Sequence, residues 1–120
     1  MEAAEREKEA DRDLGEAISD AQALSDQLRA EGLAEDAAEV ERITGVVEDV
    51  AAGRVKGEEL DKAIEDTKAE IARLRAAGKD KAAAELQHIL EKEEEARNGR
   101  AKAKALGREA ALLSAEEDAV

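Results

Sequence analysis

AISDAQALSDQLRAEG, residues 17–32, recurs 46 positions later as AIEDTKAEIARLRAAG, residues 63–78. The two segments share Ala-Ile, Asp, Ala, Leu-Arg-Ala and the closing glycine at equivalent places, and the match continues beyond that glycine. Self-similarity at a fixed period is typical of repeated supersecondary units. The sequence therefore predicts a repeat of about 46 residues within a single domain, 1–120, with its copies at 11–56, 57–102 and, in part, 103–120.

Apolar residues recur at spacings of three and four within each copy, which is typical of one face of an amphipathic helix. The first stripe of the unit consists of Leu14, Ala17, Ile18, Ala21, Leu24 and Leu28, repeated as Leu60, Ala63, Ile64, Thr67, Ile71 and Leu74. The second stripe consists of Ala37, Val40, Ile43, Thr44, Val47 and Val50, repeated as Ala83, Leu86, Ile89 and Leu90. Each unit therefore predicts two helices.

Glycines mark the expected helix ends. Gly32 and Gly78 each follow an arginine in the last turn, where a cation complements the helix dipole and glycine then takes the left-handed conformation. Asn98-Gly99 predicts a further stop, because the apolar stripes before and after it do not align on one straight helix. The sequence thus predicts five helices, near 2–31, 33–52, 58–77, 80–97 and 100–117.

Short connections make sequential helices antiparallel. The expected fold is therefore all-α, with about five antiparallel helices arranged as an up-and-down bundle or a short stack of helical hairpins. Ala69, Ala72 and Ala76 form a second apolar strip on the helix at 58–77, and this strip favours the stack.

The composition excludes several classes of function. The chain has 32 acidic and 19 basic residues, a net charge of −13, and no Phe, Trp, Tyr, Cys or Pro. Nucleic-acid binding needs clustered cations, so no nucleic-acid partner is expected. Disulfides, thiolate catalysis and thiolate metal sites are impossible without cysteine. Neither a membrane span nor a signal peptide is predicted, because the longest apolar run is Ala110–Leu113.

His88 is the one imidazole, and Glu85 stands three residues before it, a spacing found in carboxylate-bridged di-metal bundles. Such sites need a second pair of this kind, and the sequence has none. The helical phase of His88 is nearly opposite that of Leu86 and Leu90, which predicts an exposed position. We therefore expect no metal site, and we predict no catalytic or cofactor-binding residue.

The acidic run Glu93–Glu95 is expected to lack the buried environment that general acid and base catalysis requires. The segments 1–13 and 91–97 offer few apolar side chains, and solvated helix is the favoured interpretation of both. The three serines do not form a nucleophile motif. These observations predict that the protein is not an enzyme.

Three glycines lie inside the expected helices, at Gly15, Gly45 and Gly107. Glycine costs a helix about 1 kcal/mol relative to alanine. Close helix crossing or a local bend is the expected reason for them, and room for a ligand is the alternative.

The helix ends LRAEG and LRAAG, the connection AAGKDKAAAEL and the Ala, Glu, Lys, Leu and Arg composition resemble de novo designed helical bundle or helical repeat proteins. The resemblance implies a structural scaffold with no natural substrate. We therefore expect a non-enzymatic scaffold.

Two alternative functions are open. One is a protein interaction or self-assembly module that uses an exposed helix face, such as that of Leu112 and Leu113. The other is a binder of a small molecule in the small-residue core, near Gly15, Ala21, Gly45 or Gly107, and such a ligand is the less expected partner. Acidification toward pH 5 is expected to stabilise the chain by reducing its self-repulsion.

Overall fold

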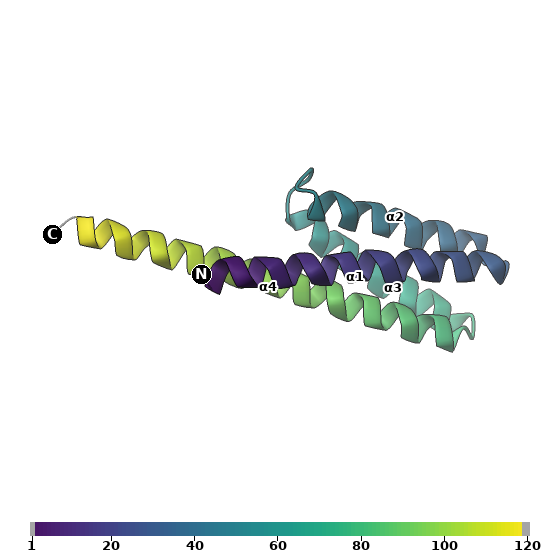
Figure 1. Cartoon of the computed structure of the whole chain (residues 1–120). Coiled ribbons are helices and arrows are strands. Elements are labelled where there is room, and N and C mark those ends of the chain that lie inside the picture. The colour runs from purple at the N-terminus through teal and green to yellow at the C-terminus, as the bar shows by residue number, and fades with distance from the viewer. Residues whose placement is uncertain (1, 119–120) are drawn as a thin grey trace.

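The computed structural model describes the backbone of residues 2–118 and the side chains of residues 12–101. This part of the chain is all-helical, as predicted. It contains four helices, α1 (Glu2–Ala30), α2 (Ala34–Ala51), α3 (Glu58–Ala76) and α4 (Asp80–Asp118) (Figure 1).

The helices form a closed ring. α1 packs against α2 and α4, and α3 also packs against α2 and α4. Contact between the first and last helix closes the ring, so the fold is an up-and-down four-helix bundle rather than an open stack of hairpins. The inference from the second alanine strip was wrong, because Ala69, Ala72 and Ala76 are exposed.

Gly32 lies just after the end of α1 and adopts the left-handed conformation, with φ of 83°. The Leu33 amide donates to the Leu28 carbonyl at 2.8 Å, and the Gly32 amide donates to the Arg29 carbonyl at 3.1 Å. This pair of hydrogen bonds is the Schellman motif. The same pair recurs after α2 and after α3, at Gly53 and Gly78. The predicted stops at Gly32 and Gly78 are confirmed.

The break predicted at Asn98-Gly99 is wrong, because α4 continues through both residues. The expected helices 80–97 and 100–117 are one helix, and the count over residues 2–118 is four. The apolar stripe that follows this point lies outside the described side chains. The connection between α2 and α3 lies beside this part of α4, where an Arg100 Nη2 donates to the Val50 carbonyl at 3.5 Å. Beyond it α4 continues past the ends of α2 and α3 (Figure 1).

The buried side chains of the two hairpins match at the repeat spacing. α1 and α3 bury equivalent leucines, at Leu14 and Leu60 and at Leu28 and Leu74, and α2 and α4 bury Val40 and Leu86. Two of the equivalences replace an apolar side chain by an acid. Glu70 occupies the place of Leu24, and Glu93 occupies the place of Val47, yet both acids are as buried as the residues they replace.

Gly15 and Gly45 lie within helices without any close neighbour. A Cβ atom added at either residue would meet nothing within 4 Å, so neither glycine marks a close helix crossing, contrary to the sequence prediction. Gly107 lies outside the described side chains. Space for a Cβ at the two described glycines means that neither is needed for packing.

Replacing Gly15 with Ala is expected to raise the free energy of unfolding by about 0.5–1 kcal/mol, since alanine fits the helical backbone and the site is open. The matched variant Gly78→Ala is expected to lower it by about 1–2 kcal/mol, because φ there is 75°. Urea denaturation of both variants checks the pair. Equal signs of the two changes would contradict the helix-end assignment.

Candidate functional site

His88 lies on the outer face of α4, as its helical phase predicted. Its side chain is 79% exposed, and its Nδ1 lies 3.6 Å from a carboxylate oxygen of Glu91. Glu85 is half-buried one turn earlier. Among residues 12–101, the structure contains no group of three or more His, Asp or Glu side chains placed to hold a metal ion. The arrangement at His88 is therefore a surface pair of side chains.

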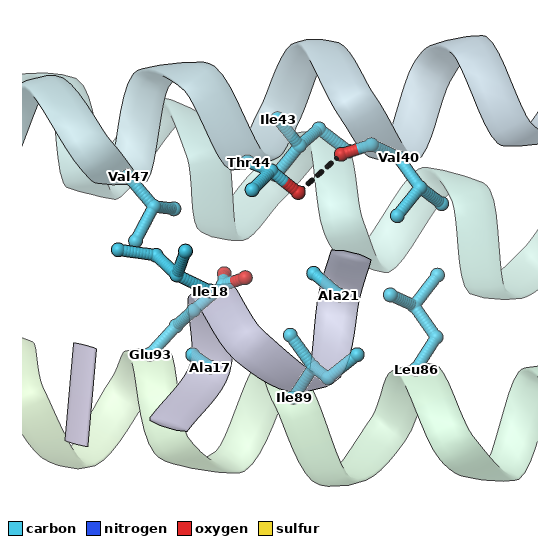
Figure 2. A pocket seen from close by; sticks show the side chains of 10 residues that line it. All are labelled: Ala17, Ile18, Ala21, Val40, Ile43, Thr44, Val47, Leu86, Ile89 and Glu93. Atoms are coloured by element: carbon cyan, nitrogen blue, oxygen red, sulfur yellow. Dashed lines mark hydrogen bonds between the residues drawn. The ribbon is translucent and has the colours of Figure 1, made fainter. Parts of the chain in front are cut away.

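The bundle interior contains a cavity with a free volume of about 10 Å³, beside Glu93 (Figure 2). That volume fits a single water molecule at most. The lining comes from three helices and is apolar except for two residues; its members are Ala17, Ile18, Ala21, Val40, Ile43, Thr44, Val47, Leu86, Ile89 and Glu93. A small molecule of several heavy atoms does not fit this space.

Glu93 reaches from α4 into this interior, where Figure 2 shows its carboxyl group beside Ile18. The residue is 1% exposed, so the expectation of a solvated acid in the segment 91–97 was wrong for Glu93. Its two carboxyl oxygens lie 3.2 Å and 3.3 Å from the Thr67 hydroxyl of α3. Burial raises the pKa of Glu93 to about 8, against the smaller opposing effect of the Thr67 hydrogen bond.

The Thr67 hydroxyl has one proton and two neighbours. It lies 2.8 Å from the Ala63 carbonyl, one turn back on α3, as well as near Glu93. A protonated Glu93 satisfies all three groups, because it donates to the Thr67 oxygen while the hydroxyl donates to the Ala63 carbonyl. A charged Glu93 would require the hydroxyl proton for itself and would leave Ala63 without that donor. The hydrogen-bond geometry thus favours the neutral acid at Glu93.

A second acid, Glu70, is buried between α3 and α2, with its side chain 1% exposed. Its Oε2 accepts a hydrogen bond of 2.7 Å from the Arg73 Nε, and its buried Oε1 has no donor within reach. Burial and the neighbouring Asp36 carboxyl raise the pKa of Glu70 to about 7, against the opposing effect of Arg73. A proton on the Glu70 carboxyl, shared with the Asp36 carboxyl, would reduce the cost of this orphaned oxygen.

Exposed ion pairs surround Glu70 at the seam between α2 and α3. Arg42 of α2 pairs with Glu39 on its own helix and with Asp66 of α3, the latter at 2.7 Å. Such exposed pairs contribute little, about 0–1 kcal/mol each. The seam therefore depends more on the state of the buried acid than on these pairs.

Comparison of the two repeat copies indicates a core position for both buried acids, whereas their residue type alone indicates exposure. Each acid stands at a repeat position whose other copy is apolar, Leu24 for Glu70 and Val47 for Glu93. Solvated helix was expected for the whole segment 91–97, which includes Glu93. Glu70 was missed, since an isolated glutamate in an amphipathic helix is normally assigned to the solvent face.

Comparisons of the chain with protein-family models, with curated proteins and with solved structures found no match. Within the described residues, no helix combines the length and the apolarity that crossing a membrane would require.

The wild-type free energy of unfolding is expected to fall as the pH rises from about 5 to 8. A carboxyl group whose pKa is raised by folding holds its proton more tightly in the folded state, so its full stabilising effect is present below the ordinary value of 4.5. The effect is lost as the pH rises through about 7 for Glu70 and about 8 for Glu93. Urea denaturation across this range checks the slope, and stability that rises with pH would contradict it.

Proposed function

We propose that the protein is a non-enzymatic helical scaffold, whose role depends on its shape and on the helix faces it presents. The observation that carries this proposal is the filled interior. Glu93 contacts the Thr67 hydroxyl, Thr67 bonds to the Ala63 carbonyl, and Glu70 bonds to Arg73. The cavity beside Glu93 has a free volume of only about 10 Å³. This packing supports the scaffold over the alternative of a small-molecule binder in the core.

The shape of the chain gives the scaffold its form. α1 has 29 residues and α4 has 39, whereas α2 has 18 and α3 has 19. The two longer helices therefore project beyond the connection between α2 and α3 (Figure 1). The resulting molecule measures 66 × 22 × 19 Å. A four-helix section that extends into a narrower helical rod is suited to spacing or presenting, and the resemblance to designed helical proteins accords with this role.

A second candidate, a protein interaction module, is favoured by the projecting part of α4. An open groove of about 1080 Å³ lies at its base, where the α2–α3 connection meets α4. The groove is lined by cations and anions together, including Lys56, Glu58, Asp61 and Arg97. A mixed set of charges of this kind suits a polar protein surface as the partner.

Sedimentation velocity from low to high micromolar concentration tests the scaffold proposal. An elongated monomer with unchanged sedimentation at all concentrations is the expected result. Reversible association would favour the interaction module, and the paired variant Leu112→Glu, Leu113→Glu would then show whether α4 carries it. A matched change on the bundle surface, Val55→Glu, serves as the control, since Val55 is already exposed. A compact sedimentation shape would contradict the rod.

A further inference from the structure

We propose that α3 is held in the bundle by two protonated carboxyl groups, Glu70 against α2 and Glu93 against α4, and that loss of these protons releases α3. The helix has a buried acid at each of its two interfaces. Glu70 belongs to α3 and faces the Asp36 carboxyl of α2, while Glu93 belongs to α4 and meets the Thr67 hydroxyl of α3. Both acids are 1% exposed or less, so neither can move its charge into water while α3 stays docked.

The surroundings of Glu93 contain little that could stabilise its charge. α3 offers one hydroxyl, that of Thr67, which also serves the Ala63 carbonyl. The α1 and α2 residues that line the cavity are apolar apart from Thr44, whose hydroxyl bonds to the Val40 carbonyl at 2.7 Å. The charged group that acts on it from α4 is Glu94, of the same sign. A proton lost from Glu93 is therefore uncompensated among the described residues.

The surroundings of Glu70 are mixed in sign. Arg73, one turn along α3, binds one carboxyl oxygen, but its side chain is 55% exposed, so water screens it. From α2, the Asp36 carboxyl acts on the Glu70 carboxyl, and Glu39 lies near Arg73 with its own partner, Arg42. Deprotonation places two carboxylates against each other across the α2–α3 seam, which favours separation of the two helices.

Deprotonation is expected to release α3 rather than α1, because the α1–α2 hairpin has no acid at the two equivalent positions. The equivalents of Glu70 and Glu93 are Leu24 and Val47, both buried in the first hairpin. α3 is joined to its neighbours by the connections 52–57 and 77–79, so it can leave its groove while α1, α2 and α4 stay together.

Amide hydrogen exchange of the full chain at pH 6 and pH 9, corrected for the intrinsic rate, tests the proposal. The opening equilibrium of α3 amides, residues 60–74, is expected to rise by on the order of 10²- to 10³-fold between these pH values. The amides of α1 between residues 14 and 28 are expected to change much less. Opening of α3 that is independent of pH, or an equal rise in α1, would overturn the proposal.

The variant Glu70→Gln, Glu93→Gln keeps the size of both side chains and removes both charges. It is expected to abolish the rise in α3 opening, and each single variant is expected to remove its own part. The matched control Glu65→Gln, Glu95→Gln changes exposed acids of the same two helices by the same total charge. The control should exchange like the wild type. An equal loss in the control would assign the effect to general self-repulsion and overturn the proposal.

Discussion

Replacing Glu93 with Leu is expected to raise the free energy of unfolding at pH 7 by roughly 3 kcal/mol. Burial raises the pKa of Glu93 to about 8, so the folded protein at pH 7 carries this glutamate in its protonated form. In the unfolded chain the same glutamate has lost its proton at pH 7, and this difference lowers the free energy of unfolding of the wild type. Leucine has a similar volume and suits a site whose repeat equivalent is Val47. The Thr67 hydroxyl keeps its hydrogen bond to the Ala63 carbonyl.

Urea denaturation at pH 7 measures this gain. The control is Glu95→Leu, two residues further along α4 and exposed, for which a change within about 0.5 kcal/mol is expected. Near pH 5 the gain in free energy of unfolding of Glu93→Leu over the wild type should be smaller. At that pH the glutamate is partly protonated in the unfolded state as well, so keeping it neutral in the folded state costs less. A destabilised Glu93→Leu protein at pH 7 would contradict a net cost of burying the carboxyl group at this position.

The reciprocal change, Val47→Glu, is expected to lower the free energy of unfolding at pH 7 by roughly 3 kcal/mol or more. It places an acid in the first hairpin at the position equivalent to Glu93. The partner is absent there, because the equivalent of Thr67 is Ala21, which has no hydroxyl. Val47 is also 2% exposed and packs beside the central cavity, so its removal costs apolar burial as well.

Denaturation at pH 5 and pH 7 distinguishes the charge from the lost packing. Part of the loss in Val47→Glu should be recovered at pH 5, where the acid takes up a proton. Ala38→Glu, on the exposed face of α2, is the control and is expected to have a small effect at both pH values. An equally small effect of Val47→Glu would contradict the assignment of position 47 to a closed core.

The repeat and the apolar spacing were sufficient to predict an all-α fold and its core. Leu14, Leu28, Leu60 and Leu74 are all buried, and Gly32 and Gly78 end helices with the expected backbone conformation. These features are local, since a helix face and a helix end depend on residues within a few turns.

The continuation of α4 past Asn98 and Gly99 could not be predicted from local signals. Asparagine and glycine weaken a helix by only about 1 kcal/mol each, which neighbouring packing can offset. Ala96 is fully buried just before this point, and Arg100 reaches the end of α2 just after it. This packing depends on where α2 ends in space, which the residues near Asn98 do not encode.

The buried acids show a different limit of the sequence. A glutamate at a core position of one repeat can be in one of three states. It can be exposed to solvent, buried with a charge and an ion-pair partner, or buried and neutral. The sequence pattern is the same for all three states. At Glu93 the deciding features are the Thr67 hydroxyl, which comes from α3, and the exclusion of water by α1 and α2. At Glu70 the deciding neighbour is Asp36 on a different helix.

A ¹³C nuclear magnetic resonance titration of the Glu93 side-chain carboxyl in the folded protein tests most directly whether this acid is buried and neutral. A midpoint near pH 8 is expected, with the neutral acid as the main form at pH 7. A midpoint near the ordinary value of 4.5 would show a solvated carboxylate at this position and would contradict the buried, proton-dependent core.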